Sequence, residues 1–334
     1  ALGNEHTCAL LTNGSVSCWG TGTWGQLGAG LSLSSSSTPV LTDQLGQTGR
    51  TAIALTSGSS HTCAILDDRS LVCWGYNGYG ALGIGSYTNM YSPTYVQSLT
   101  SGSSVNVTSV EAGVSHTCAI LSSGASCWGI GSSGELGNGY TTNLAYPTTV
   151  NSFGTGVNAV EIVAGWSHSC ALLNTGNISC WGNGLYGVLG DNTSNSSLSP
   201  KPSFAIPTND SIIELSSRNV HTCALTDNNS TWCWGNNMMG ELGNGQWSNR
   251  DHPSLTDDLP NNGTIALPER DFDGDGVMNE FQAMIDSNDS DGDGWDDDDD
   301  DFNQTIMASI ACLPGTVGRY SCLDSIPGTY APNV

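Results

Sequence analysis

Hydrophobic and polar residues alternate with a period of two in short segments that recur along the chain. In residues 6–11, His-Thr-Cys-Ala-Leu-Leu, every second side chain falls on the same face of an extended strand. A turn at residues 12–14, Thr-Asn-Gly, separates this strand from a second one over residues 15–19. A three-residue turn with glycine in the left-handed position places Cys8 directly opposite Cys18. Opposed residues of an antiparallel pair have Cα atoms about 4.5–5.5 Å apart, within disulfide range. The pattern therefore predicts a β-hairpin closed by a disulfide.

The same hairpin pattern occurs five times along the chain. His-Thr-Cys-Ala stands at 6–9, 61–64, 116–119 and 221–224, and His-Ser-Cys-Ala at 168–171, so the intervals are 55, 55, 52 and 53 residues. Each copy is followed by Cys-Trp-Gly and then by a Gly-x-Leu-Gly box. The third copy is one residue shorter, and a two-residue turn at Ser122-Ser123 again places Cys118 opposite Cys127. The predicted disulfides are Cys8–Cys18, Cys63–Cys73, Cys118–Cys127, Cys170–Cys180 and Cys223–Cys233, with Cys312 and Cys322 as a sixth pair outside the series.

Each repeat holds about four short strands. An apolar segment such as residues 160–165 precedes the histidine, and a further extended segment such as residues 147–150 follows the glycine-rich box. Four-stranded units of this length, arranged radially, form a β-propeller, which leaves only short protected edges. We predict an all-β fold, with a propeller of about five blades over residues 1–267, an acidic segment at 268–303 and a cysteine-containing tail at 304–334.

The three motifs, in this order, resemble the repeats of the regulator-of-chromosome-condensation propeller family. The resemblance covers roughly residues 1–267 and implies blades of this length, usually seven, whereas five repeats are present here. The first repeat starts at Ala1-Leu2-Gly3, which aligns with Ala112-Gly113, so its leading strand is missing. Either residues 264–267 supply that strand and close the ring, the reading we favour, or the place is filled by another molecule or by more of a longer chain. Guanine-nucleotide exchange, the best-known activity of the family, is not carried over to an acidic, cysteine-paired chain.

The net charge and the cysteines limit the possible partners and the cellular location of the protein. Among 334 residues, 31 Asp and Glu stand against 7 Lys and Arg, a formal net charge of −24. This charge repels phosphate backbones and anionic lipids, so we expect no nucleic-acid partner. We expect no membrane insertion either, because no run of about 18 apolar residues occurs. The even number of cysteines and the lack of a zinc-type CxxC pair favour an oxidising, extracellular location.

The repeated histidines, at positions 6, 61, 116, 168 and 221, have two interpretations, a metal site or a structural role. Each stands two residues before a paired cysteine, and no acidic partner recurs beside it, so we expect each to bond the backbone of a neighbouring blade. The tryptophans of Cys-Trp-Gly are expected to pack between blades. No Ser/His/Asp order, paired-carboxylate spacing or phosphate loop stands out, so we predict that the protein is not an enzyme.

Beyond Pro268 the composition changes. Residues 269–301 hold 15 of the 31 acidic residues, and two Asp-x-Asp-x-Asp-Gly runs place oxygens at alternate positions of a glycine turn, the geometry that Ca²⁺ prefers. These runs resemble the calcium loops of thrombospondin type 3 repeats and, more loosely, EF-hands. Where an EF-hand needs glutamate, Gln282 and Asp300 stand instead, which favours the former. The alternative is a disordered acidic linker. The candidate Ca²⁺ residues are Asp271, Asp273, Asp275, Val277, Asp286, Asp289, Asp291, Asp293, Trp295 and Asp297.

Eleven Asn-x-Ser/Thr sequons fit a secreted glycoprotein, although a chain rich in Asn, Ser and Thr produces many by chance. They lie at Asn13, Asn106, Asn177, Asn192, Asn195, Asn209, Asn228, Asn229, Asn262, Asn288 and Asn303.

Together these features predict a non-enzymatic extracellular structural protein, a self-assembling subunit of a surface filament or coat. Head-to-tail contact through the open first blade would produce a fibre. The alternative is a secreted or cell-surface binding module whose propeller face binds a protein or glycan.

Overall fold

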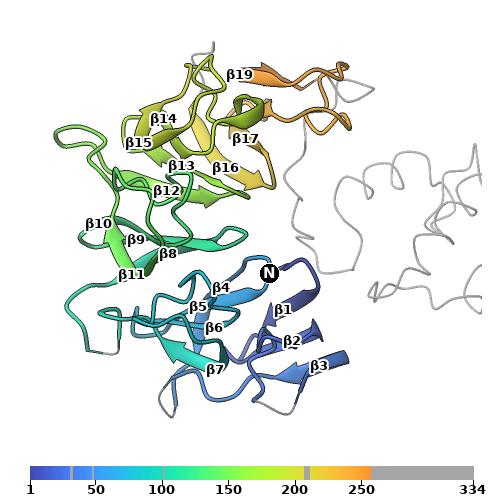
Figure 1. Cartoon of the computed structure of the whole chain (residues 1–334), viewed down its shortest axis with the longest axis vertical. Coiled ribbons are helices and arrows are strands. Elements are labelled where there is room, and N and C mark those ends of the chain that lie inside the picture. Colours follow the sequence, from blue (N-terminus) through green and yellow to red (C-terminus); the bar gives the residue numbers. More distant parts are fainter. Residues whose placement is uncertain (31–32, 47–48, 101, 207–210, 257–334) are drawn as a thin grey trace, which may run out of the picture. The chain divides into compact units, whose positions relative to one another are not determined.

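Antiparallel sheets of short strands make up the part of the chain described by the structure, a computed structural model (Figure 1). The described residues are 1–30, 33–46, 49–100, 102–206 and 211–256. They belong to one compact unit, Ala1–Asn262. The predicted boundaries at 267 and 303 and the closing strand at 264–267 lie outside the described residues.

The strands are β1 (His6–Leu10), β2 (Val16–Thr21), β3 (Ser35–Leu41), β4 (Ala52–Ser57), β5 (His61–Leu66), β6 (Leu71–Gly75), β7 (Met90–Tyr95), β8 (Val107–Ala112), β9 (His116–Leu121), β10 (Gly124–Gly129), β11 (Leu144–Thr149), β12 (Ala159–Ala164), β13 (His168–Leu173), β14 (Ile178–Gly182), β15 (Ser197–Pro202), β16 (Ile212–Arg218), β17 (His221–Thr226), β18 (Thr231–Gly235) and β19 (Arg250–Leu255), with a single 3-10 turn, η1 (Leu185–Gly187), between β14 and β15. Within these residues no helix is long and apolar enough to cross a membrane.

The strands form five sheets, which we call blades 1 to 5 in chain order. Blades 2 to 5 each hold four strands in sequence order, β4–β7, β8–β11, β12–β15 and β16–β19, and blade 1 holds β1, β2 and β3. Of the missing leading strand only its end is present, because Leu2 pairs with Thr7 and the Ala1 carbonyl accepts a hydrogen bond from the Cys8 amide. The all-β fold of repeated blades and the shortened first blade are therefore confirmed.

The hairpin register follows from the turn. In blade 1 the pairs run from Leu10 with Val16 to Cys8 with Cys18, around a three-residue turn in which Gly14 has φ 76°. Residues other than glycine rarely adopt this backbone conformation, which explains why glycine occupies position 14. In blade 3 the two-residue turn pairs Leu121 with Gly124 and again aligns the cysteines. All five intrablade disulfides form, each with a Cα–Cα distance of 4.1 Å.

The hydrophobic core is divided into clusters that lie between blades rather than inside one sheet. The cluster between blades 1 and 2 joins Cys8 and Val16 to Ala64, Leu66 and Trp74, and three further clusters repeat this arrangement along the chain. The leading strands β4, β8, β12 and β16 contact one another in succession. Each of blades 2 to 4 therefore has two different faces, one packed on the preceding blade and one on the following blade.

Each blade also has two ends. The hairpin turn before Cys-Trp-Gly lies at one end, which we call the turn end. The loop before each histidine and the loop after Cys-Trp-Gly lie together at the other end, because the Tyr76 amide donates to the Ser60 carbonyl and the Asn183 amide to Ser167. We call this second end the loop end.

Candidate functional site

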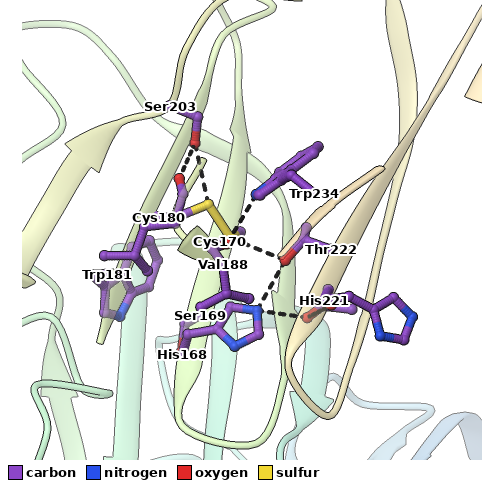
Figure 2. Close-up of a disulfide and its surroundings, with 12 residues drawn as sticks. His168, Ser169, Cys170, Cys180, Trp181, Val188, Ser203, His221, Thr222 and Trp234 are labelled. Atoms are coloured by element: carbon purple, nitrogen blue, oxygen red, sulfur yellow. Dashed lines mark hydrogen bonds between the residues drawn. A yellow bond between two sulfur atoms is a disulfide. The ribbon is translucent and has the colours of Figure 1, made fainter. Parts of the chain in front are cut away.

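The histidine and tryptophan that recur in each repeat take part in one hydrogen-bonded arrangement. It is formed four times and joins consecutive blades. The histidine Nε2 of one blade contacts the hydroxyl of the residue after the histidine in the next blade. The pairs are His6–Thr62 at 2.8 Å and His61–Thr117, His116–Ser169 and His168–Thr222 at 2.9 Å. Figure 2 shows His168 turned toward Thr222, beside the Cys170–Cys180 disulfide.

The tryptophan completes this arrangement. Its indole Nε1 donates to the carbonyl of the variable residue in the Gly-x-Leu-Gly box of the preceding blade. The pairs are Trp74–Gln26 at 3.0 Å, Trp128–Ala81 at 2.9 Å, Trp181–Glu135 at 2.8 Å and Trp234–Val188 at 2.9 Å. In two of these pairs the hydroxyl that contacts the histidine donates to the same carbonyl, Thr117 to Ala81 and Ser169 to Glu135. We call the histidine, hydroxyl, carbonyl and indole together the clasp.

The clasp fixes the protonation of the histidines. Because the Thr117 hydroxyl hydrogen is used on the Ala81 carbonyl, the His61 Nε2 must donate, so its Nδ1 carries no proton in the neutral ring. Burial lowers the pKa of His61 and His168 to about 3 and that of His6 and His116 to about 4. The interblade structural role is confirmed, but the expected backbone partner was wrong, because the partner is a side-chain hydroxyl. Among the described residues, no three His, Cys, Asp or Glu side chains gather as a metal site.

The two terminal blades each carry half of a clasp. On blade 1, Thr7, Ala9 and Trp19 are partly exposed, although their counterparts in blades 2 to 5 are buried. On blade 5, His221 and Cys223 are partly exposed, again unlike their counterparts. We call these surfaces the blade 1 face and the blade 5 face. No clasp hydrogen bond joins His221 to Thr7 within the described part of the chain.

Blades 5 and 1 do meet near the loop end. The Arg218 guanidinium donates to the carbonyls of Leu2 at 3.1 Å and Gly3 at 3.4 Å. Residues of all five blades line a cavity of about 270 Å³ there. One wall is Glu111, and burial raises its pKa to about 7, although the Thr56 hydroxyl donates to its carboxylate at 3.2 Å.

Exposed aromatic side chains concentrate at the loop end. Trp24 of blade 1 and Tyr76 and Tyr79 of blade 2 form an edge-to-face series with ring centroids 5.6 and 6.1 Å apart. Trp166 and Tyr186 of blade 4 form a second group around a cleft that also reaches Val220 of blade 5. Aromatic rings that are half in water are the usual anchors of binding surfaces.

The remaining predicted site residues divide by position. The sequons Asn13, Asn106, Asn177, Asn192, Asn195 and Asn228 are exposed and Asn229 is half-buried. The sequons at Asn209, Asn262, Asn288 and Asn303, the Cys312–Cys322 pair and all ten candidate Ca²⁺ residues lie outside the described residues. Sequence reasoning missed Trp166, Tyr186, Arg218 and Glu111. The available signal was that Trp166, Arg218 and Glu111 depart from their counterparts in the other repeats. Tyr186 gives no such signal, because Trp24 and Tyr79 hold the same position in blades 1 and 2.

The geometry defines a β-propeller-like domain of disulfide-pinned blades joined by clasps. Comparison with models of known protein families identifies the family to which this domain belongs. Residues 13–65, 70–120 and 127–172 match the regulator of chromosome condensation (RCC1) repeat, and a second model with this description matches residues 52–81 and 159–188. The chain belongs to the RCC1-repeat family.

Comparison with individual proteins supports this family membership. The chain is 30% identical over 262 residues to the ultraviolet-B receptor UVR8 of Arabidopsis thaliana, covering 78% of this chain and 57% of that protein. It is 34% identical over 251 residues to the mitochondrial RCC1 domain-containing protein RUG3 of the same plant, covering 73% and 54%. The chain thus spans little more than half the length of these relatives.

Solved structures share the fold. Human WBSCR16 has a TM-score of 0.66 at 22% identity, over 76% of this chain and 65% of that one. Yeast RCC1 (Prp20), solved with Kap60, has a TM-score of 0.66 at 20% identity, over 78% and 63%.

Proposed function

We propose that this protein is a non-enzymatic extracellular structural protein whose copies assemble head to tail through the blade 1 face and the blade 5 face. The observation that carries the proposal is the pair of half-clasps. The blade 5 face offers His221, and the blade 1 face offers Thr7 and Trp19, which are the complementary positions of the interface already formed four times in each chain.

Such an interface is heterologous, because two different surfaces meet. A heterologous contact that does not close produces an open filament. The five disulfides indicate an oxidising environment, in which a subunit of a filament or coat has to remain folded outside the cell. In a longer chain the same two faces would accept further blades of that chain, and the oligomeric state separates the two cases.

The test introduces a charge on the blade 1 face. Ala9→Arg places a long cation where the buried alanines of the other blades pack, so assembly should be lost. Thr12→Arg, in the exposed turn of the same hairpin, is the matched control and should assemble as the unmodified protein does. Sedimentation velocity over a concentration series and electron microscopy measure the outcome. Monomers of the unmodified chain at every concentration, or equal assembly of both variants, would contradict the proposal.

A second candidate function is a secreted or cell-surface binding module. The observation that favours it is the exposure of aromatic side chains at the loop end, among Asn, Ser and Gly residues. This composition is typical of protein surfaces that bind other molecules. Dispersed monomers that bind a protein or glycan, and that lose this binding on Trp24→Ala, would favour this function over assembly.

Calcium binding by the acidic segment is part of the proposal and is supported by the spacing of its aspartates alone. Asp273→Asn with Asp291→Asn should weaken Ca²⁺ binding of the full chain, because each removes a carboxylate from one loop. Asp298→Asn, in the acidic run and outside the candidate ligands, is the control. Isothermal titration with CaCl₂ measures both. Ca²⁺ binding that is equal in both variants would assign the ions to the acidic run as a whole.

A further inference from the structure

A cleft of about 290 Å³ opens at the loop end between blades 4 and 5. Its lining is Trp166, Ser167, His168, Asn183, Leu185, Tyr186, Val188 and Val220. Trp166 is 55% exposed and Tyr186 40% exposed, so two aromatic rings stand at its rim. Blade 4 alone combines an aromatic residue in the loop before the histidine with an aromatic residue directly before the Gly-x-Leu-Gly box, since the corresponding loop residues of blades 1, 2, 3 and 5 are Asn4, Ser59, Val114 and Asn219.

The backbone positions the two aromatic residues in different ways. The Trp166 amide donates to the Asn219 carbonyl at 2.6 Å, which ties the loop to blade 5. Tyr186 lies inside η1 with φ 64° and ψ 9°, a left-handed conformation that tyrosine rarely adopts. The corresponding residues Trp24, Tyr79, Ser133 and Met239 do not have positive φ. Backbone strain of this kind concentrates at binding and active sites, where surrounding contacts maintain it.

The lining is uncharged. It contains no Asp, Glu, Lys or Arg, and burial keeps His168 neutral by lowering its pKa to about 3. Two polar groups remain free to bond a ligand: within the described residues, neither the Asn183 side-chain nitrogen nor the Tyr186 hydroxyl takes part in a hydrogen bond. The Asn183 side-chain oxygen is used by the Leu185 amide at 2.9 Å, which orients the side chain.

We propose that this cleft binds one uncharged pyranose ring of a glycan. A sugar ring has a flat C–H face that stacks on the electron-rich face of an aromatic ring, and hydroxyls that bond free amide and phenol groups. The volume suits one ring rather than a folded partner, and the uncharged lining gives no counter-ion to an acidic or amino sugar. An aliphatic peptide side chain fits less well, because Ser167 and Asn183 would lose water without gaining partners. The inference goes beyond self-assembly and gives the binding-module candidate a ligand class.

The test uses the full chain, produced with disulfides and without N-glycans so that no attached sugar at Asn195 competes. The probes are cellotriose, maltotriose, mannotriose and the trisaccharide of N-acetylglucosamine, with N-acetyl-leucinamide as the peptide-like alternative. Saturation-transfer NMR detects binding and tryptophan fluorescence gives the dissociation constant. At least one neutral trisaccharide should bind and N-acetyl-leucinamide should not.

Three variants locate the site. Trp166→Ala and Tyr186→Gly should each weaken sugar binding about tenfold or more, because a stacking ring is lost. Tyr186→Gly should keep or raise Tm, because glycine adopts the left-handed conformation without strain, so its loss of binding cannot be attributed to unfolding. Tyr140→Ala, which removes a 68% exposed aromatic side chain of blade 3 outside the cleft, should bind sugar as the unmodified protein does.

The outcomes are decisive for the cleft. Binding of none of the trisaccharides, binding of N-acetyl-leucinamide instead, or sugar binding unaffected by both cleft variants would overturn the proposal. None of these results bears on head-to-tail assembly, which depends on the blade 1 and blade 5 faces. A binding module that loses its partner on Trp24→Ala while the cleft fails to bind sugar would leave the second candidate function standing without this ligand.

Discussion

A buried histidine in the clasp has one nitrogen that donates and one that is kept from water. The His116 Nδ1 is buried without any hydrogen-bond partner, and the His116 Nε2 contacts Ser169. Protonation would place a hydrogen on Nδ1 with no acceptor and a charge in an apolar interface. The clasp is therefore compatible only with the neutral ring.

The free energy of unfolding therefore depends on pH. The unfolded chain binds protons on its histidines below pH about 6.5, whereas the folded His6, His61, His116 and His168 do so only near pH 3 to 4. We expect the free energy of unfolding to fall as pH decreases from about 6.5 to 4, by up to about 1.4 kcal/mol per pH unit for each histidine. Urea denaturation followed by tryptophan fluorescence at a series of pH values measures this slope.

Two variants control the measurement. His61→Asn should reduce the slope, because one proton-binding difference is removed. Glu111 acts in the opposite direction: its folded pKa is about 7, so its contribution is present below pH about 4.5 and is lost as pH rises through 7. Glu111→Gln should remove that decline and so steepen the net fall in stability between pH about 6.5 and 4.5. Stability that does not vary between pH 4 and 6.5 would rule out the neutral clasp.

At the scale of the strands, the hairpin disulfide constrains a short local loop. Cys63 and Cys73 are separated by 10 residues and are fully buried. In the chain-entropy model, closing a loop of about this length stabilises by roughly 2–3 kcal/mol.

We therefore expect Cys63→Ala with Cys73→Ala to destabilise blade 2 by about this amount, with an added cost for lost packing. Chemical denaturation monitored by circular dichroism measures the change. The matched control is the pair Cys63→Ser and Cys73→Ser, which restores part of the volume. A double variant as stable as the parent would mean that the interblade clusters alone determine blade stability.

The hairpins were predictable from the sequence because all of their determinants are local. Turn length sets the register, and the register decides which cysteines face each other, so both the three-residue turn at Gly14 and the two-residue turn at Ser122 gave the observed pairing. The histidine partners were not predictable in the same way. His61 and Thr117 are 56 residues apart, and both the backbone and the hydroxyl of the next blade were chemically suitable acceptors.

The cleft of blade 4 was missed for a related reason. Trp166 and Tyr186 stand on two loops of one blade, and the hydrogen bond that holds Trp166 comes from the Asn219 carbonyl on the next blade. A comparison that looks for what the five copies share passes over Trp166, because only blade 4 has an aromatic residue at that position. Tyr186 did not stand out, because Trp24 and Tyr79 hold the same position in blades 1 and 2. The left-handed backbone at Tyr186 has no signature in the sequence, since glycine is the residue normally expected there.

For the whole molecule, each blade contacts mainly its neighbours along the chain, so stability approximates a sum over blades and interblade interfaces. The four hydrophobic clusters all lie at such interfaces, and blades 1 and 5 each lack one. The sequence predicted the number of blades and the defect in blade 1 because both follow from counting motifs. Its statement about ring closure rested on residues 264–267 and stays a prediction.

The clasp also has a direction. Histidine always reaches forward to a hydroxyl, and indole always reaches back to a carbonyl, so the two outer surfaces of the blade series are chemically distinct. A filament built on this contact would be polar, with every subunit pointing the same way and unlike tips. A molecule that capped one end of such a filament would leave the other end free to grow. Filament length would then be regulated at a single end.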